Sequence, residues 1–211
     1  MSYIKDPMKI ETTSFEIIEM IMREQKWCFP NHHHHIYKRV IHTSADFDYL
    51  NNLKVNSNFV DAMISAKDKP ITLYTDTQMV LSGINKKALA KTKWNLKCFV
   101  STDEAQKLAL EKEMTRSMAA IELALEESGE KIFVIGNAPT ALYQLMEHAD
   151  VTAKGVLGVI GVPVGFVGAA ESKQALYESG IPSIVALGRK GGSNIAATII
   201  NAILYDAVGR A

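Results

Sequence analysis

Residues capable of chemistry gather directly after the short apolar runs of this chain. The segments are Thr75-Asp76-Thr77, Ser101-Thr102, Gly136 to Thr140, Gly161 to Gly165 and Gly188 to Ser193. In a parallel sheet, ligands bind beyond the carboxyl ends of the strands, where helix starts present backbone N–H groups to carboxylates or phosphates. These segments are therefore the first candidates for a site that binds an anionic ligand.

The common phosphate-binding motifs are absent from these segments. Neither Gly-x-Gly-x-x-Gly nor a P-loop follows any of the apolar runs, and the glycine-rich stretch Gly188 to Ser193 has a different spacing. Helix capping and close packing account for Gly158, Gly165 and Gly168. A nucleotide-dependent oxidoreductase or transferase thus remains only a second hypothesis.

Two cations have two possible roles each. Arg116 stands among Leu, Ala, Met and Glu in a stretch with helical spacing, where it either pairs with Glu113 or Glu122 or binds an anionic ligand. Lys173 lies near the start of another predicted helix. A positive charge is unfavourable at the positive end of the helix dipole. This cost suggests that Lys173 binds a ligand and does not serve structure alone.

His42 is the histidine with the most suggestive surroundings. Ser44, two residues later, is expected to cap a short helix and to place the imidazole near the start of that helix. His42 either acts as a general acid or base in catalysis or has a structural role.

Four consecutive histidines, His32 to His35, resemble a metal-binding tract. Structural zinc ligands, however, come at defined spacings with cysteine or carboxylate companions, and four adjacent histidines do not have such a spacing. We therefore predict no physiological metal and no cofactor.

Short apolar runs alternate with longer helical patterns from Ile71 onward. Almost continuous apolar character is typical of parallel strands covered on both faces. The predicted strands are Ile71 to Tyr74, Leu96 to Val100, Ile132 to Ile135, Val156 to Ile160 and Ile184 to Leu187. The predicted helices are Ser14 to Trp27, Asn58 to Ala66, Thr102 to Glu127, Ala138 to His148, Ala169 to Ser179 and Ser193 to Val208.

Repeated βα units predict an α/β fold: a doubly wound, mostly parallel sheet of about five strands, flanked by helices and preceded by a helical N-terminal segment. No linker or break in composition divides residues 1–211, so we expect one domain.

Charge and composition narrow the range of partners. The 211 residues include 23 basic and 23 acidic ones, a balance that supplies little attraction for nucleic acid or an anionic membrane. The longest uncharged stretch, Gly155 to Ala170, is too short to span a bilayer. Cys28 and Cys98 form no metal or disulfide pattern, and Lys5, Asp6 and Pro7 interrupt any signal peptide, so we expect the cytoplasm.

Several strings resemble the precorrin-8X methylmutase family, which includes a cobalt-precorrin-8 branch. Similarity runs in order from about Ser14 to Asn201. The strings are Arg39 to Asp46, Thr75 to Val80, Thr115-Arg116-Ser117, Ile135 to Leu142, Gly161 to Lys173 and Gly188 to Ser193.

This resemblance implies an isomerase that moves a methyl group between two neighbouring ring carbons of a corrinoid, giving hydrogenobyrinate or cobyrinate. It implies a homodimer with the active site at the subunit interface, and a histidine proton donor that maps onto His42. Asp46 or Asp48 is a candidate to orient that imidazole. The implied substrate contacts are Ser14, Arg39, Thr77, Arg116, Asn137, Lys173, Arg189 and Ser193.

Physical reasoning about the ligand agrees with this set. A corrinoid acid is a large apolar ring edged by carboxylates, so it needs flat apolar surface with cations and N–H donors around it. Met79, Val164 and Phe166 are candidates for the apolar floor, and core packing is the alternative for each.

Two departures limit the resemblance. Many members have an arginine just before the Ser-Phe pair, where this chain has Thr13, so only Ser14 is carried over. The tract His32 to His35 is not a family feature. A corrinoid carrier that binds but does not convert the ring remains a non-enzymatic alternative.

Overall fold

A six-stranded sheet in the order β1-β6-β5-β4-β2-β3 forms the centre of the protein. The computed structural model describes residues 5–30, 32–148 and 151–209. Strand β1 pairs antiparallel with β6, and all other neighbours are parallel. The strands are β1 (Leu53–Val55), β2 (Ile71–Thr75), β3 (Asn95–Lys97), β4 (Glu130–Ile135), β5 (Val156–Gly161) and β6 (Ser183–Ala186).

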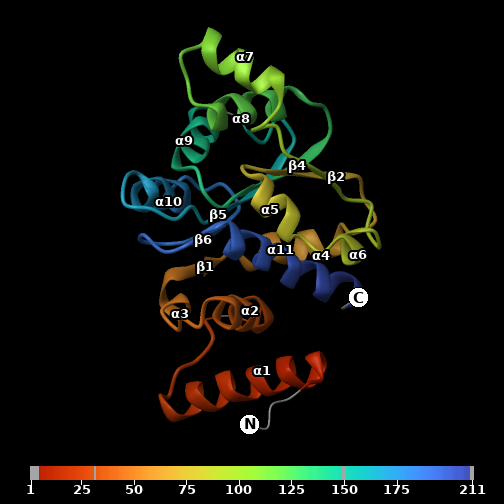
Figure 1. Cartoon of the computed structure of the whole chain (residues 1–211), viewed down its shortest axis with the longest axis vertical. Coiled ribbons are helices and arrows are strands. Elements are labelled where there is room, and N and C mark those ends of the chain that lie inside the picture. Colours follow the sequence, from red (N-terminus) through yellow and green to blue (C-terminus); the bar gives the residue numbers. More distant parts are fainter. Residues whose placement is uncertain (1–4, 31, 149–150, 210–211) are drawn as a thin grey trace.

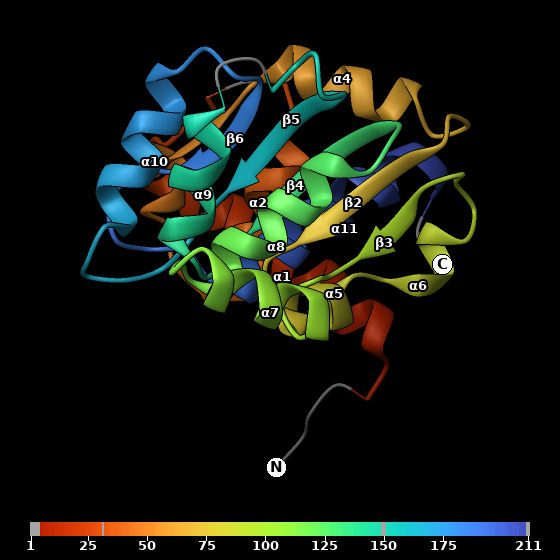
Figure 2. The ribbon, with the colours of Figure 1, turned by 90° about the horizontal axis from the view of Figure 1, so that it is seen from above.

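Helices cover both faces of this sheet. They are α1 (Pro7–Glu24), α2 (His34–Ser44), α3 (Tyr49–Asn52), α4 (Ser57–Ser65), α5 (Gln78–Gly83), α6 (Lys86–Leu89), α7 (Asp103–Glu111), α8 (Arg116–Glu126), α9 (Pro139–Glu147), α10 (Ala169–Glu178) and α11 (Ser193–Val208). Figure 2 looks onto the sheet with α8 and α9 in front and with α2 and α11 behind.

Strand β4 shows why the central runs are almost continuously apolar. Ile132 and Val134 belong to the core shared with α2, α4 and α11, whereas Phe133 and Ile135 belong to the core under α8, α9 and α10. Successive side chains of a strand point to opposite faces, so a strand covered on both sides needs apolar residues at every position. The predicted doubly wound α/β fold is confirmed.

The sheet has one strand more than the predicted number of about five. Strand β1 spans three residues and carries Lys54 in its middle, and only Leu53 of the three is buried. A strand this short lacks the apolar run by which the others were predicted. It adds an antiparallel edge in a segment that we expected to be mostly helical.

The single helix predicted over Thr102 to Glu127 is wrong. Helix α7 ends at Glu111, Glu113 adopts a left-handed conformation with φ of 51°, and α8 starts at Arg116. Thr115 caps α8 by accepting a hydrogen bond from the Met118 N–H at 3.2 Å. The apolar spacing continues through both helices because α7 packs against α8 and α8 packs against α9, so periodicity alone could not show the turn.

Helix α1 lies at the far end of the molecule from α7 and packs against α2, as Figure 1 shows. It begins earlier than predicted because Asp6 caps it, accepting from the Met8 N–H at 2.9 Å. Helix α2 in turn packs along α11. Among the described residues, no helix combines the length and the apolar composition needed to cross a bilayer.

Candidate active site

The segments that follow β2, β5 and β6 meet at the carboxyl edge of the sheet. The hydroxyl groups of Thr77 and Ser193 lie 3.0 Å apart, although 116 residues separate them in sequence. The Gly192 N–H donates to the Val162 carbonyl at 2.8 Å. These bonds bring the start of α11 between the other two segments.

Asp76 is a buried organising residue of the candidate segment after β2, and we assigned it no role of its own. Its carboxylate accepts hydrogen bonds from the N–H groups of Gly136, Asn137 and Ala138 at 3.0, 2.7 and 2.8 Å. Burial raises the pKa of the Asp76 carboxyl, and the three N–H groups act against that rise. An acidic residue directly after a buried strand was the available signal for this role.

The same bonds correct our expectation for the turn at Asn137. Backbone N–H groups of this turn already donate to Asp76, so they do not face a ligand. Asn137 itself is exposed, and its side-chain amide remains available to a ligand. The starts of α10 and α11 also carry no side-chain cap.

Lys173 does not lie on an exposed rim, contrary to our expectation. Its side chain is fully buried, and the ammonium donates to the Lys190 carbonyl at 2.6 Å. Burial lowers the pKa of this lysine to about 8, because the protein interior solvates the charged form poorly. Lys173 therefore supports the segment that carries Arg189 and Lys190 from beneath.

Asp46 and Asp48 do not contact His42, so the expectation that one of them orients the imidazole is corrected. Both carboxylates bind the Lys190 ammonium, at 2.5 and 2.6 Å. Burial raises the pKa of Asp46, but hydrogen bonds from Lys190 and from the Asp48 N–H outweigh it and leave that pKa below its ordinary value. Lys190 thus ties the segment after β6 to the segment after α2.

His42 lies in the last turn of α2 and not near a helix start, because Ser44 ends this helix and does not cap a new one. The imidazole is exposed and packs edge-on against Phe15 of α1, with ring centroids 5.4 Å apart. Among the described residues, no hydrogen bond engages its ring nitrogens. The next residue, Thr43, shares a hydrogen bond of 3.0 Å with Thr198 of α11.

Two further predicted contacts lie close to His42 in sequence or in space. Arg39, one turn earlier on α2, pairs with Glu11 at 3.1 Å and stacks over the Tyr205 ring at 4.5 Å. Ser14, beside Phe15 on α1, donates to the Ile10 carbonyl at 2.7 Å. The structure thus places both residues at the packing of α1 on α2, with Arg39 already paired.

Of the four cations expected to contact the substrate, Arg116 and Arg189 are exposed and form no ion pair with a described residue. Arg116 is exposed at the first position of α8 and makes no ion pair with Glu113 or Glu122. Glu122 binds His148 and Gln144 instead, at 2.6 and 2.8 Å. Arg189 is exposed after β6, with its guanidinium 5.7 Å from the centre of the Phe166 ring.

An exposed apolar strip accompanies these cations. Phe166 and Val167 are 86% and 90% exposed, and Val164 is 47% exposed. Met79, at the start of α5, is 68% exposed. The residues proposed for an apolar floor are therefore on the surface, so core packing does not account for them.

A cleft of about 450 Å³ opens beside Phe166. It is lined by Asn52, Phe166, Ala170, Glu171, Leu187, Gly188, Arg189 and Lys190. Another hollow, of about 400 Å³, lies under α4 at the opposite end of the strands, between Phe59, Ile71 and Leu157. The first one adjoins the carboxyl edge, where parallel sheets bind ligands. Its apolar wall and exposed guanidinium suit a large ring that carries acid groups.

Comparison with known proteins gives one consistent result. The family model for precorrin-8X methylmutase matches residues 9–206. Cobalt-precorrin-8 methylmutase of Salmonella typhimurium is 50% identical over 97% of this chain and 98% of its own length. Precorrin-8X methylmutase of Pseudomonas aeruginosa is 35% identical over 80% of this chain and 81% of its own. A crystal structure of the Thermus thermophilus precorrin-8x methyl mutase superposes with a TM-score of 0.81 and 29% identity, covering 94% of this chain and 96% of that one.

Proposed function

Because the chain belongs to the precorrin-8X methylmutase family, we propose that it moves a methyl group from ring carbon 11 to ring carbon 12 of precorrin-8X or cobalt-precorrin-8. Such an isomerase needs neither an external methyl donor nor a redox step. Its product is hydrogenobyrinate, or cobyrinate when the ring carries cobalt. Cobalamin biosynthesis is the pathway that the family serves.

The exposed strip of Val164, Phe166 and Val167 beside Arg189 is the observation that carries this proposal. A soluble protein rarely leaves such large apolar side chains so open unless they contact a ligand or a partner. A flat corrinoid ring would cover the strip, while its carboxylates pair with the guanidinium groups of Arg189 and Arg116.

Smaller polar groups complete the proposed rim. The side-chain amide of Asn137 and the hydroxyl groups of Thr77 and Ser193 lie at the same carboxyl edge and suit acetate or propionate side chains. Helix α10, whose start carries no side-chain cap, follows the candidate segment after β5. Ser14 and Arg39 join the proposal as residues that hold α1 and α2 around His42.

His42 is the proposed proton donor. Protonation of the conjugated ring makes it electron-poor and lowers the barrier to methyl migration. An imidazolium interacts favourably with the last turn of a helix, where His42 lies. Lys190, held by Asp46 and Asp48, acts as a positioning residue that fixes the turn after α2 relative to the ring-binding segment.

A homodimer with the active site at its interface is part of this proposal. One protomer leaves Phe166 and Val167 open to solvent, whereas a site normally buries most of its ligand. Helix α1 packs against α2 and still exposes Ile10, Ile17 and Met20. A second copy would cover such surfaces, which light scattering of the purified protein tests directly.

We also infer that the protein works as a single domain in the cytoplasm. Cys28 and Cys98 are unpaired, as expected in a reducing compartment. Fractionation of cells that express the protein tests the compartment.

Turnover is tested by mixing the protein with precorrin-8X and, separately, with cobalt-precorrin-8, and recording visible spectra over time. We expect conversion of one ring at least, and its loss in His42→Ala with ring binding retained. His34→Ala, at the other end of the same helix, is the matched control and should convert the ring at the wild-type rate.

Other results separate the alternatives. Binding of a ring without conversion by the wild-type protein would indicate a corrinoid carrier. Conversion by His42→Ala at the wild-type rate would remove His42 from the mechanism but leave the isomerase activity standing. Failure to bind either ring would contradict the proposed substrate.

A further inference from the structure

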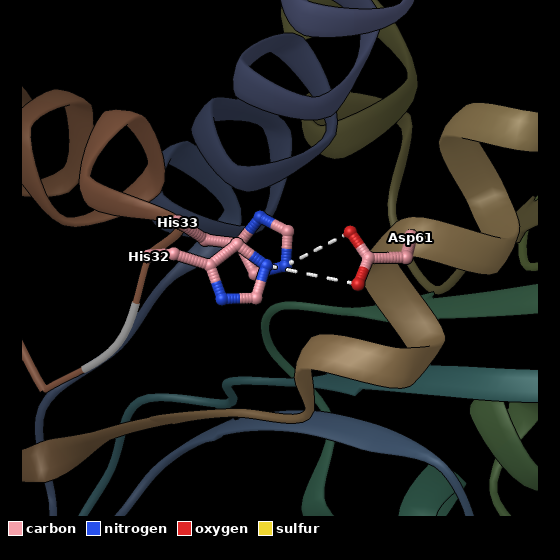
Figure 3. A group of neighbouring side chains, drawn as sticks. All are labelled: His32, His33 and Asp61. Carbon is pink, nitrogen blue, oxygen red and sulfur yellow. Dashed lines mark ion pairs between the residues drawn. The ribbon is translucent and has the colours of Figure 1, made fainter.

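Two histidines of the tract before α2 converge on one carboxylate of α4. His32 Nε2 lies 3.7 Å from Asp61 Oδ2, and His33 Nε2 lies 3.4 Å from Asp61 Oδ1. One ligand atom from each of the three residues fits within a span of 4.8 Å. Figure 3 shows both imidazole rings on one side of the gap and the carboxylate of Asp61 on the other.

The carboxylate of Asp61 supplies a companion ligand of another residue type from a different element. Asp61 is distant from the tract in sequence, and α4 brings it opposite His32 and His33. Two imidazoles and one carboxylate are a donor set used by late first-row divalent metals, with water in the remaining positions.

The spacing of these atoms also suits a shared metal ion. Ligands about 2.1 Å from a tetrahedral metal lie roughly 3.4 Å from one another. The two nitrogen–oxygen distances, 3.4 and 3.7 Å, are close to that value. The two distances end on different oxygens of one carboxylate, and His32 and Asp61 are exposed side chains that can rotate toward a shared ion.

Charge and burial around the three residues favour a bound cation. His33 is 3% exposed, and its Nε2, which also lies 3.3 Å from the Ser57 carbonyl, binds an ion in the tautomer that carries the ring proton on Nδ1. The described residues offer Asp61 no Lys or Arg, and its ion pairs are those to the two histidines. The positive end of α2 opposes a nearby cation, but Asp61 and the neighbouring Asp206 supply the opposite charge.

We propose that His32, His33 and Asp61 form a binding site for one late first-row divalent metal ion of the Zn²⁺, Co²⁺ or Ni²⁺ class. The site joins the segment before α2 to α4 and is separate from His42 at the other end of α2. A bound ion stabilises the folded chain, because the ligands are brought together only by folding. This proposal does not depend on the methyl-transfer activity.

The test uses full-length protein prepared without an affinity tag of histidines. Titration with Zn²⁺ followed by calorimetry, and with Co²⁺ followed by visible absorption, should show one equivalent bound. Asp61→Asn and His32→Gln should each weaken binding at least about tenfold, since even loss of a partner outside the ligand set costs that much. The thermal midpoint of the wild type should rise with Zn²⁺, and that of Asp61→Asn should not.

Two matched controls distinguish this site from nonspecific binding by the tract. His34→Gln removes a histidine that stacks on Phe29 with centroids 4.7 Å apart, and Asp68→Asn removes an exposed aspartate nearby. Both should bind as the wild type does. Equal weakening by His34→Gln and His32→Gln, or full binding by Asp61→Asn, would overturn the proposal. Both ligand variants are at exposed positions, so loss of folding does not confuse the result.

Discussion

The ammonium of Lys190 lies 2.5 Å from the carboxylate of Asp46, and this pair joins segments that are 144 residues apart. Lys190 follows β6, beside the proposed ring-binding surface. Asp46 follows α2, and the last turn of α2 contains His42. The same ammonium reaches Asp48 at 2.6 Å. The pairs therefore fix the position of the proposed proton donor relative to the proposed ring.

Replacing Lys190 by Met should lower kcat by about 10- to 100-fold, because small displacements of a reacting group have effects of this size. The free energy of unfolding should change little, since ion pairs at the surface contribute little to stability. Lys190→Arg should restore most of the rate.

Steady-state kinetics of both variants check this prediction, with Lys107→Met as the control. Lys107 is exposed on α7 and lies 3.8 Å from Glu111, so it removes a comparable surface pair far from His42. Unchanged kcat in Lys190→Met would show that the pairs do not position the reacting groups.

Stability should depend on pH through Lys173. Because burial lowers the pKa of Lys173 to about 8, the unfolded chain binds this proton more tightly than the folded protein does. The folded protein therefore gains stability as pH rises from about 8 toward the ordinary value of 10.5. In Lys173→Met this gain is absent.

Urea denaturation of wild type and Lys173→Met between pH 8 and pH 10 measures the effect. The difference in free energy of unfolding, wild type minus variant, should grow by roughly 2 kcal/mol over this interval. The subtraction removes the other lysines and tyrosines, which titrate in both proteins. A difference that stays flat with pH would mean that Lys173 titrates as an exposed lysine.

Asp76→Asn should destabilise the protein by about 2–4 kcal/mol. The buried carboxylate accepts three backbone N–H groups, and an amide in its place turns an N–H₂ group toward some of these donors. Denaturant unfolding measures the loss. A matched substitution at an exposed site, Asp68→Asn, should leave stability within about 0.5 kcal/mol, and a similar small change in Asp76→Asn would contradict the prediction.

Phe166→Ala should weaken ring binding by about tenfold without changing the free energy of unfolding. The side chain is 86% exposed, so its removal opens no cavity in the core. Spectral titration with the corrinoid measures the dissociation constant. Leu110→Ala is the control, because Leu110 is 74% exposed on α7 and should bind the ring normally. Equal effects of both variants would count against Phe166 as part of the floor.

Much of the fold follows from patterns that the chain carries locally. Four of the five predicted strands appear close to their predicted bounds, because buried parallel strands need apolar side chains at successive positions, as β4 illustrates. The strand predicted over Leu96 to Val100 is shorter and is shifted to Asn95–Lys97, because β3 lies at the edge of the sheet and is not buried. The ends of helices and the short strand β1 were harder to predict from the sequence. The break between α7 and α8 depends on the left-handed conformation of one residue, Glu113. Strand β1 forms through its hydrogen bonds to β6, and its own three residues show no strand pattern.

The sequence by itself determined the α/β fold class, the family and the residue types available at the carboxyl edge. Only the tertiary structure decided which of those residues face a ligand. It buries Lys173, pairs Asp46 and Asp48 with Lys190, and uses the N–H groups at Asn137 to bind Asp76. It also brings Asp61 to the histidine tract. The reason is physical: local patterns set periodicity and capping, whereas the partner of a charged group is set by contacts between residues distant in sequence.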